Sequence, residues 1–409
     1  MKRDRGARPW RALALLSLAE LLVMSVWFTA SAVAPEFQAR WDLSSSEVGW
    51  LTAAVQLGFV AGTAAAALLN LADILPSRLY FACAAFLSAG ANALVLVATG
   101  LPLALAFRFL TGFMLAGVYP PAMKMISTWF RQNRGLAIGT LVGALTVGKA
   151  TPYLLKALPE VSLGGVVLGA SGAALVGGVL VLLSYQDGPF PFLRQPFSWD
   201  LVSRVARHRE TRLAIAGYLG HMWELYAMWT WVPAFLLASA CLAPGAAAGA
   251  SSTAVVDLVA FGAIATGGAG CVWGGWAADR MGRERLVNLA MAVSGVCALV
   301  VGLFFGWSLW ILAPIVWVWG FFVVADSAQF SALVTEVAPQ EAVGTALTLQ
   351  TSVGFLLTMV TIQALPLVTD AVGWQWSFSL LALGPIFGIG AILRFSRVRR
   401  NVAGPDRPL

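Results

Sequence analysis

Apolar segments of about 20 residues recur along the whole chain, with short polar breaks between them. Each is long enough to cross about 30 Å of hydrocarbon as a helix. About twelve such segments are present, near 12–34, 48–69, 79–98, 103–126, 135–157, 163–184, 213–238, 253–277, 286–305, 309–333, 343–366 and 375–395. Open strands cannot satisfy their backbone groups in lipid, so the pattern predicts an all-α polytopic membrane protein.

Composition excludes an ordinary soluble domain. The chain is 59% hydrophobic and 11% charged, against about 25% charged in a typical soluble domain. Its net charge of +7 does not indicate nucleic acid, because the arginines gather in alternate loops and at both ends. The opposite loops hold only Arg40 and Lys156. The positive-inside rule predicts two cytoplasmic termini in a plasma (inner) membrane, with the lipid bilayer as partner.

A polar stretch divides the predicted spans six and six. We expect an N-terminal six-helix bundle over 1–184, a cytoplasmic linker over 185–212, and a C-terminal bundle and tail over 213–409. The two halves share a pattern: ELLVMSVW begins at Glu20, and ELYAMWTW begins 204 residues later (224 minus 20) at Glu224. An even number of spans per half predicts parallel repeats about an axis along the membrane normal.

Three short motifs resemble those of the major facilitator superfamily. The loop after the eighth span contains Gly275, Asp279, Arg280, Gly282 and Arg283 in the spacing G-x-x-x-D-R-x-G-R. Its N-terminal counterpart is degenerate and keeps Asp73 and Arg78 without the glycines, and Arg108-Phe-Leu-Thr-Gly112 resembles the superfamily's R-x-x-x-G motif. The resemblance implies twelve transmembrane helices as two rocking bundles, with spans one, four, seven and ten lining a cavity. It also implies a cytoplasmic gate formed by these loop residues.

The repeated pattern places acidic residues inside the membrane. Glu20, Met24 and Trp27 are spaced i, i+4, i+7 on one helix face, and Glu224, Met228 and Trp231 repeat that face. A carboxylate facing lipid is expensive, so both should face the bundle interior. We expect Glu20, Glu224, nearby His221 and Asp326 of span ten to handle a coupling proton. The alternative is structural: each group pairs or packs within its own half.

Two cations also lie within predicted spans. Lys149 is in the middle of span five and Arg108 is in span four, where they can bind an anion or pair with a buried carboxylate. Four further residues on cavity-facing spans complete the expected substrate site: Trp27, Trp231, Tyr226 and Gln329.

The sequence therefore predicts a secondary active transporter that moves a small anionic solute by alternating access with proton coupling. We expect a monomer with no cofactor and no metal. No enzyme is expected, since neither a nucleophile-base pair nor a nucleotide-binding loop is present in the sequence. Two alternatives remain open: a proton-driven exporter of hydrophobic or cationic compounds, and a transporter-like solute sensor.

Overall fold

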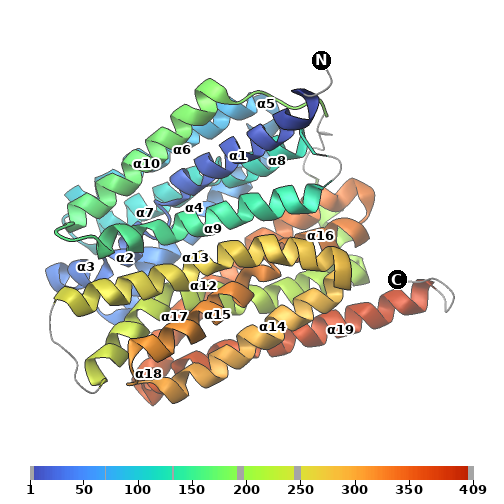
Figure 1. Ribbon diagram of the computed structural model, residues 1–409. Helices are drawn as coiled ribbons and strands as arrows, with labels where there is room; N and C mark the ends of the chain where they lie inside the picture. The colour runs from blue at the N-terminus through green and yellow to red at the C-terminus, as the bar shows by residue number, and fades with distance from the viewer. Residues whose placement is uncertain (1–3, 70, 131–132, 191–197, 244–249, 404–409) are drawn as a thin grey trace.

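The computed structural model describes residues 4–69, 71–130, 133–190, 198–243 and 250–403, and within them the regular structure is helical (Figure 1). The first half contains α1 (Asp4–Met24), α2 (Thr29–Ala32), α3 (Ala34–Trp41), α4 (Ser45–Leu68), α5 (Leu71–Ile74), α6 (Ser77–Leu94), α7 (Leu101–Leu115), α8 (Tyr119–Ser127), α9 (Arg134–Ala157) and α10 (Leu163–Ser184). The second half contains α11 (Trp199–Arg207), α12 (Arg209–Leu242), α13 (Ala250–Met281), α14 (Arg283–Val300), α15 (Leu309–Ala325), α16 (Ser327–Val337), α17 (Val343–Val372), α18 (Trp374–Ser377) and α19 (Leu383–Ala403).

The predicted fold class is confirmed. Within the described residues, eleven helical segments are long and apolar enough to cross a membrane. The remaining predicted span is the first, near 12–34, and it corresponds to α1 and α2, which a non-helical turn at Ser25–Phe28 separates. Most boundaries fall within a few residues of those expected, and α10 covers the predicted 163–184.

The spans form two bundles, in which α1 to α10 pack on one another and α12 to α19 do the same. Between the bundles, α9 packs against α13 and α4 packs against α17. A Cβ added to Gly143 of α9 would lie 2.7 Å from the carbonyl oxygen of Gly268 in α13. Glycine at this position therefore allows the two backbones to touch.

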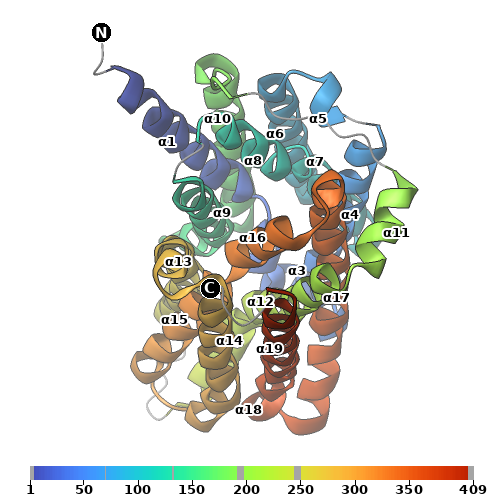
Figure 2. The ribbon, with the colours of Figure 1, turned by 90° about the vertical axis from the view of Figure 1, so that its right-hand side faces the viewer.

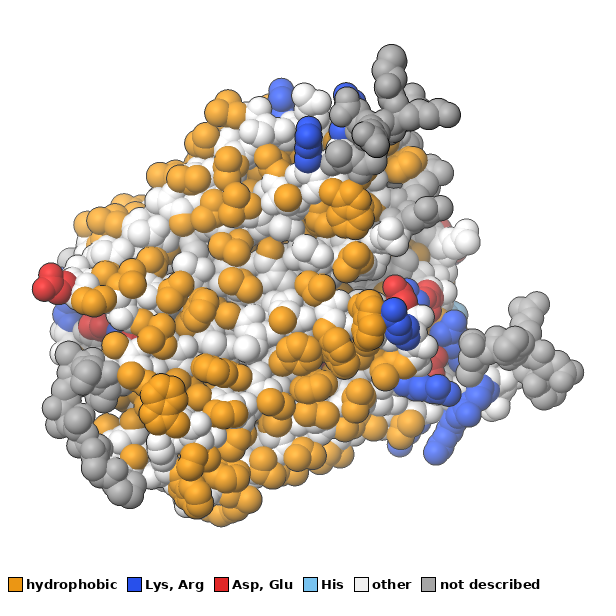
Figure 3. Space-filling model, viewed as in Figure 1, with side chains coloured by type: hydrophobic (Ala, Val, Ile, Leu, Met, Phe, Trp, Pro, Cys, Tyr) orange, Lys and Arg blue, Asp and Glu red, His pale blue; other side chains and the backbone are white. Residues whose placement is uncertain are grey.

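Both chain termini lie at the same end of the molecule, which we call the termini side (Figures 1 and 2); the other end is the opposite side. Hydrophobic side chains cover the middle of the face in Figure 3, and most of its Lys and Arg side chains lie toward the termini side. This distribution is typical of a membrane protein whose charged residues flank an apolar belt.

Three spans are interrupted near their middle, whereas α12 continues for 34 residues. Span one breaks at Ser25–Phe28, span four breaks between α7 and α8, and span ten breaks at Asp326 between α15 and α16. Pro120 and Pro121 begin α8, and proline cannot donate a hydrogen bond to the preceding turn. The start of α4 has a simpler design: Ser44 and Glu47 form a capping box.

Candidate functional site

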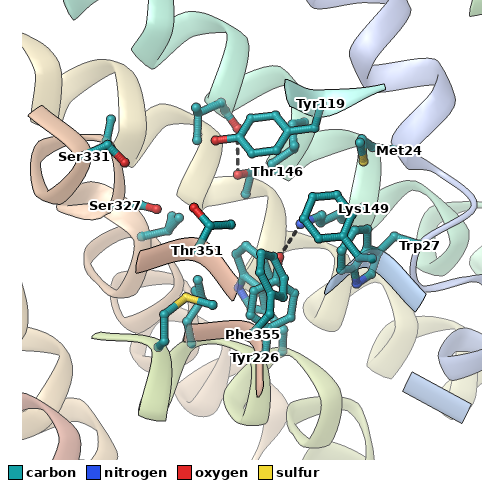
Figure 4. Close-up of a pocket in the computed structure, with 18 of the residues that line it drawn as sticks. Met24, Trp27, Tyr119, Thr146, Lys149, Tyr226, Ser327, Ser331, Thr351 and Phe355 are labelled. Carbon is teal, nitrogen blue, oxygen red and sulfur yellow. Dashed lines mark hydrogen bonds between the residues drawn. The ribbon is translucent and has the colours of Figure 1, made fainter. Parts of the chain in front are cut away.

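A cavity lies between the two bundles near the breaks in spans one and ten (Figure 4). The space between its lining atoms is about 740 Å³, which includes open solvent, and about 70 Å³ of it is accessible to the centre of a water molecule. Its lining comprises Met24, Trp27, Phe59, Tyr119, Met123, Ile138, Val142, Leu145, Thr146, Lys149, Tyr218, Met222, Leu225, Tyr226, Trp229, Val324, Ser327, Ala328, Ser331, Thr351 and Phe355.

Lys149 is the one charged residue among these described lining residues. Its ammonium group lies 4.1 Å from the ring centre of Trp27, 4.8 Å from that of Tyr226 and 5.7 Å from that of Trp229. It also donates a hydrogen bond to the Tyr226 hydroxyl (Figure 4). Aromatic faces stabilise a cation, so these rings hold a positive charge at the end of the cavity.

Glu20 lies close to this lysine but outside the cavity lining. The α1 and α9 backbones meet where a Cβ on Gly148 would lie 2.2 Å from the carbonyl oxygen of Leu21. Glu20 precedes Leu21 in α1, and Lys149 follows Gly148 in α9. Their side chains interact electrostatically. The Glu20 side chain is fully buried, and neither oxygen accepts a hydrogen bond from a described residue. Among the described residues, Lys149 is the cation that acts on this carboxyl group.

Glu224, the counterpart of Glu20 in the second half, has different surroundings. One of its oxygens accepts a hydrogen bond of 2.6 Å from Trp319 Nε1. The other accepts one of 2.9 Å from the Ser294 hydroxyl. These donors come from α15 and α14, so Glu224 joins helices inside the second bundle and is not among the described residues that line the cavity.

Asp326 and His221 form a buried pair at the break in span ten. His221 Nδ1 lies 2.9 Å from Asp326 Oδ1, and each side chain is 1% exposed. Neither lines the cavity within the described residues, although Tyr218, Met222 and Ser327 beside them do. The two side chains therefore pair within the second half, and the pair is ionic only when the imidazole is protonated.

Arg108 is directed at the backbone of span one. Its guanidinium donates to the carbonyl oxygens of Val26 at 3.0 Å, Leu51 at 3.3 Å and Trp27, and to Asn92 Oδ1 at 3.0 Å. Val26 and Trp27 lie in the non-helical turn, where carbonyls lose their helical partners. Arg108 is fully buried. It supports the broken helix and is not among the described residues that line the cavity.

The remaining expected binding residues are divided between two places. Trp27 and Tyr226 line the cavity, as Lys149 does. Trp231 instead donates from Nε1 to the Ile362 carbonyl at 3.0 Å and packs close to Gly49 of the first bundle. Gln329 is buried in α16 outside the described lining.

The bundles are joined on the opposite side of the cavity. Gln56 of α4 accepts a 2.5 Å hydrogen bond from Thr358 of α17. Ser46 Oγ and the Gln363 side chain are hydrogen-bonded at 2.9 Å between the same helices. With the contacts of Trp231, these bonds close the interface between the cavity and the opposite side.

The expected gate residues lie at the termini side. Gly282 has φ +86° in the turn between α13 and α14, which favours glycine. Arg283 pairs with Glu336 of α16, and the Arg280 guanidinium lies 3.8 Å from the ring centre of Trp276. Asp279 is exposed. Among the described residues, Arg283 pairs with Glu336 and not with this aspartate.

The other expected gate residues are Arg78, Asp73 and Gly275. Arg78 is exposed in the first turn of α6, and the Asp73 side chain lies outside the described residues. Gly275 is buried, close to the Gly135 backbone of the first bundle.

Several lining residues were missed in the sequence analysis. Ser327 and Ser331 are one turn apart on α16, and Thr351 and Phe355 are one turn apart on α17. Spacing of i, i+4 was the available signal, but polar residues of this size are too common in spans to identify a site. Tyr119 lies just after the break in span four, and the break itself was not predicted.

Comparison with known proteins establishes the family. Residues 16–253 match the model of the Major Facilitator Superfamily. The chain belongs to the major facilitator superfamily. Residues 217–395 also match a family model described as sugar (and other) transporter. No curated protein sequence matches the chain.

Solved structures of the superfamily show the same fold. One is a bacterial homolog of the human lysosomal transporter Spinster, in an inward-facing and unoccupied conformation. It has 13% identity and a TM-score of 0.71, over 97% of this chain and 98% of that one. The same homolog in an inward-facing and occupied conformation has 14% identity and a TM-score of 0.69, over 94% and 96%. This superfamily member is therefore an integral membrane protein with a transporter fold.

Proposed function

We propose that this chain moves a small anionic solute across the membrane by alternating access, coupled to protons. The observation that carries the proposal is Lys149, the one charged group among the described residues lining the cavity between the bundles. A cation in a low-dielectric cavity attracts an anion strongly, and the cavity lies at the bundle interface, where rocking exposes it to either side.

Alternating access is supported by the distribution of contacts. The hydrogen bonds of Gln56 with Thr358 and of Ser46 with Gln363, with the contact of the Trp231 ring and Gly49, close the opposite side. We infer that these contacts separate when the termini side closes. The basic residues at the termini side support an orientation with cytoplasmic termini in a plasma membrane.

Proton coupling is supported by Glu20. When Glu20 and Lys149 are both ionised, their charges cancel and little attraction for an anion remains. A proton on Glu20 frees the charge of Lys149, so anion and proton binding favour each other. Asp326 with His221 is the alternative proton site. Glu224 is a weaker candidate because neutral donors already satisfy both of its oxygens.

The test is flux into proteoliposomes under an imposed pH gradient. A panel of radiolabelled nitrate, phosphate, benzoate and tetraphenylphosphonium covers both charge classes. We expect an anion to accumulate with inward proton flow, and Lys149→Gln to reduce the rate at least tenfold. The matched control is Lys156→Gln, since Lys156 is on the same helix but pairs with Glu36 outside the cavity lining.

A second candidate is an exporter of hydrophobic cations, which the rings of Trp27, Tyr226 and Trp229 favour. Those rings already face Lys149, so a cationic solute would meet its charge. Extrusion of tetraphenylphosphonium that survives in Lys149→Gln would replace the anion proposal with this one.

A further inference from the structure

The ammonium group of Lys149 has little room for ligand oxygens. One of its three N–H groups is directed to the Tyr226 hydroxyl, and aromatic rings cover its other sides at 4.1–5.7 Å. Phosphate and sulfate are recognised by several donors, most often from a planar arginine fork. The described lining contains no arginine, and the nearby Arg108 is occupied by backbone carbonyls. A single small acceptor group fits this lysine best.

The charge count at the site points to one negative charge. A protonated Lys149 carries one positive charge, and its buried neighbour Glu20 becomes neutral only by taking a proton. A monoanion then leaves the buried site with zero net charge. A dianion would leave one uncompensated negative charge in an apolar environment, which is strongly unfavourable.

The walls beyond Lys149 are mostly apolar. They include Phe59, Val142, Leu145, Leu225, Val324 and Phe355. Hydroxyl groups of Ser327, Ser331 and Thr351 are on the side formed by α16 and α17 (Figure 4). A ligand body that buries apolar surface against the first set gains hydrophobic free energy, which an inorganic anion such as nitrate cannot do.

We propose that the solute is a monocarboxylate with an apolar or aromatic body, whose carboxylate pairs with Lys149. The inference rests on the proposed anion transport through this cavity. It adds a substrate class: one carboxylate and an apolar body, in preference to phosphates, dianions or small inorganic anions.

The test measures the unfolding temperature, Tm, of the full chain in detergent with matched probes. Benzoate is the positive probe, and phenyl phosphate, nitrate, benzyl alcohol and benzylammonium each change one property. At about 100 times its Kd, a ligand that binds the native state should raise Tm by a few degrees. We expect benzoate to do so, the other probes to give a much smaller shift, and Lys149→Gln to lose the benzoate response while Lys156→Gln keeps it.

Each result separates the substrate class from the proposed function. If phenyl phosphate or nitrate stabilises as well as benzoate and depends on Lys149, anion transport stands and the monocarboxylate inference is overturned. If benzylammonium stabilises in wild type and in Lys149→Gln, both are overturned. Absence of any benzoate shift in the folded wild type also overturns the inference. Should Lys149→Gln fail to fold, the wild-type ranking decides, and Lys149→Arg, which keeps the charge, must retain the benzoate response.

Discussion

The stripe of Glu20, Met24 and Trp27 on α1 and the stripe of Glu224, Met228 and Trp231 on α12 have the same residues in different surroundings. Glu20 accepts no hydrogen bond from a described residue and interacts with Lys149. Glu224 accepts two hydrogen bonds from neutral donors. Trp27 lies against the lysine in the cavity, whereas Trp231 lies beside Gly49 of the first bundle on the opposite side.

The difference comes from the helices that surround each stripe. Span one breaks after Met24, while α12 continues through Trp231 to Leu242. The break directs Trp27 into the cavity and requires Arg108 to support its carbonyls. A repeated sequence thus fixes which face of a helix is turned inward, and residues from other helices decide what that face does.

Replacement of Arg108 should have the largest effect, because its guanidinium bonds two carbonyls in the break of span one. In Arg108→Leu, the carbonyls of Leu51, Val26 and Trp27 lose a buried donor. We expect a loss of about 3–5 kcal/mol in the free energy of unfolding, at about 1–3 kcal/mol for each unsatisfied group with partial relaxation. Thermal unfolding in detergent measures it. The exposed Arg78→Leu is the control, and equal losses in both variants would refute the support role.

Replacement of Glu20 should remove the pH dependence of anion binding. In wild type, acid conditions protonate Glu20 and free Lys149, so benzoate should bind up to about tenfold more tightly for each pH unit of decrease while Glu20 titrates. Among the described residues, Lys149 acts electrostatically on Glu20, and Glu20 in turn acts on Tyr119. Glu20→Gln should bind with little pH dependence, as measured by isothermal titration at several pH values. Glu224→Gln is the matched control, and loss of the pH dependence there instead would transfer the proton role to the second stripe.

Replacement of Glu224 should mainly reduce stability. Glu224→Gln keeps the shape but weakens the charge-assisted bonds from Trp319 and Ser294, which predicts a loss of about 1–2 kcal/mol. Glu20→Gln should change stability by less, because that carboxylate accepts no hydrogen bond from a described residue. Chemical denaturation of both variants compares them. The reverse order would mean that the two stripes have exchanged roles.

Replacement of Trp231 should have the smallest effect of the four. Trp231→Phe shortens the ring that lies beside Gly49 of the first bundle. The lost apolar contact, worth about 1 kcal/mol, should raise the opening of the opposite side about fivefold. Labelling of a cysteine placed at Gln363 reports this opening. Trp27→Phe is the control in the first stripe, and its labelling rate should remain at the wild-type level.

The fold was predictable because each span is specified locally by its apolar run. The predicted interval 163–184 is the range of α10. The site was predictable only in part. Lys149, Trp27 and Tyr226 line the cavity as expected, but Arg108 and Glu224 take partners from helices far away in the chain. Helical periodicity gives the direction of a side chain and does not identify what it meets.

The broken first span also has a consequence for synthesis. Its Trp27 carbonyl is satisfied by Arg108, which lies 81 residues later in the chain. At a synthesis rate of about 5–20 residues per second, this donor follows about 4–16 s after the turn that needs it. During that interval an open turn would expose unpaired carbonyls to lipid, so the first span must be inserted as a straighter helix and acquire its break when span four arrives. The ligand-facing shape of the N-terminal bundle is therefore made after insertion, in an assembly step that α12 does not need.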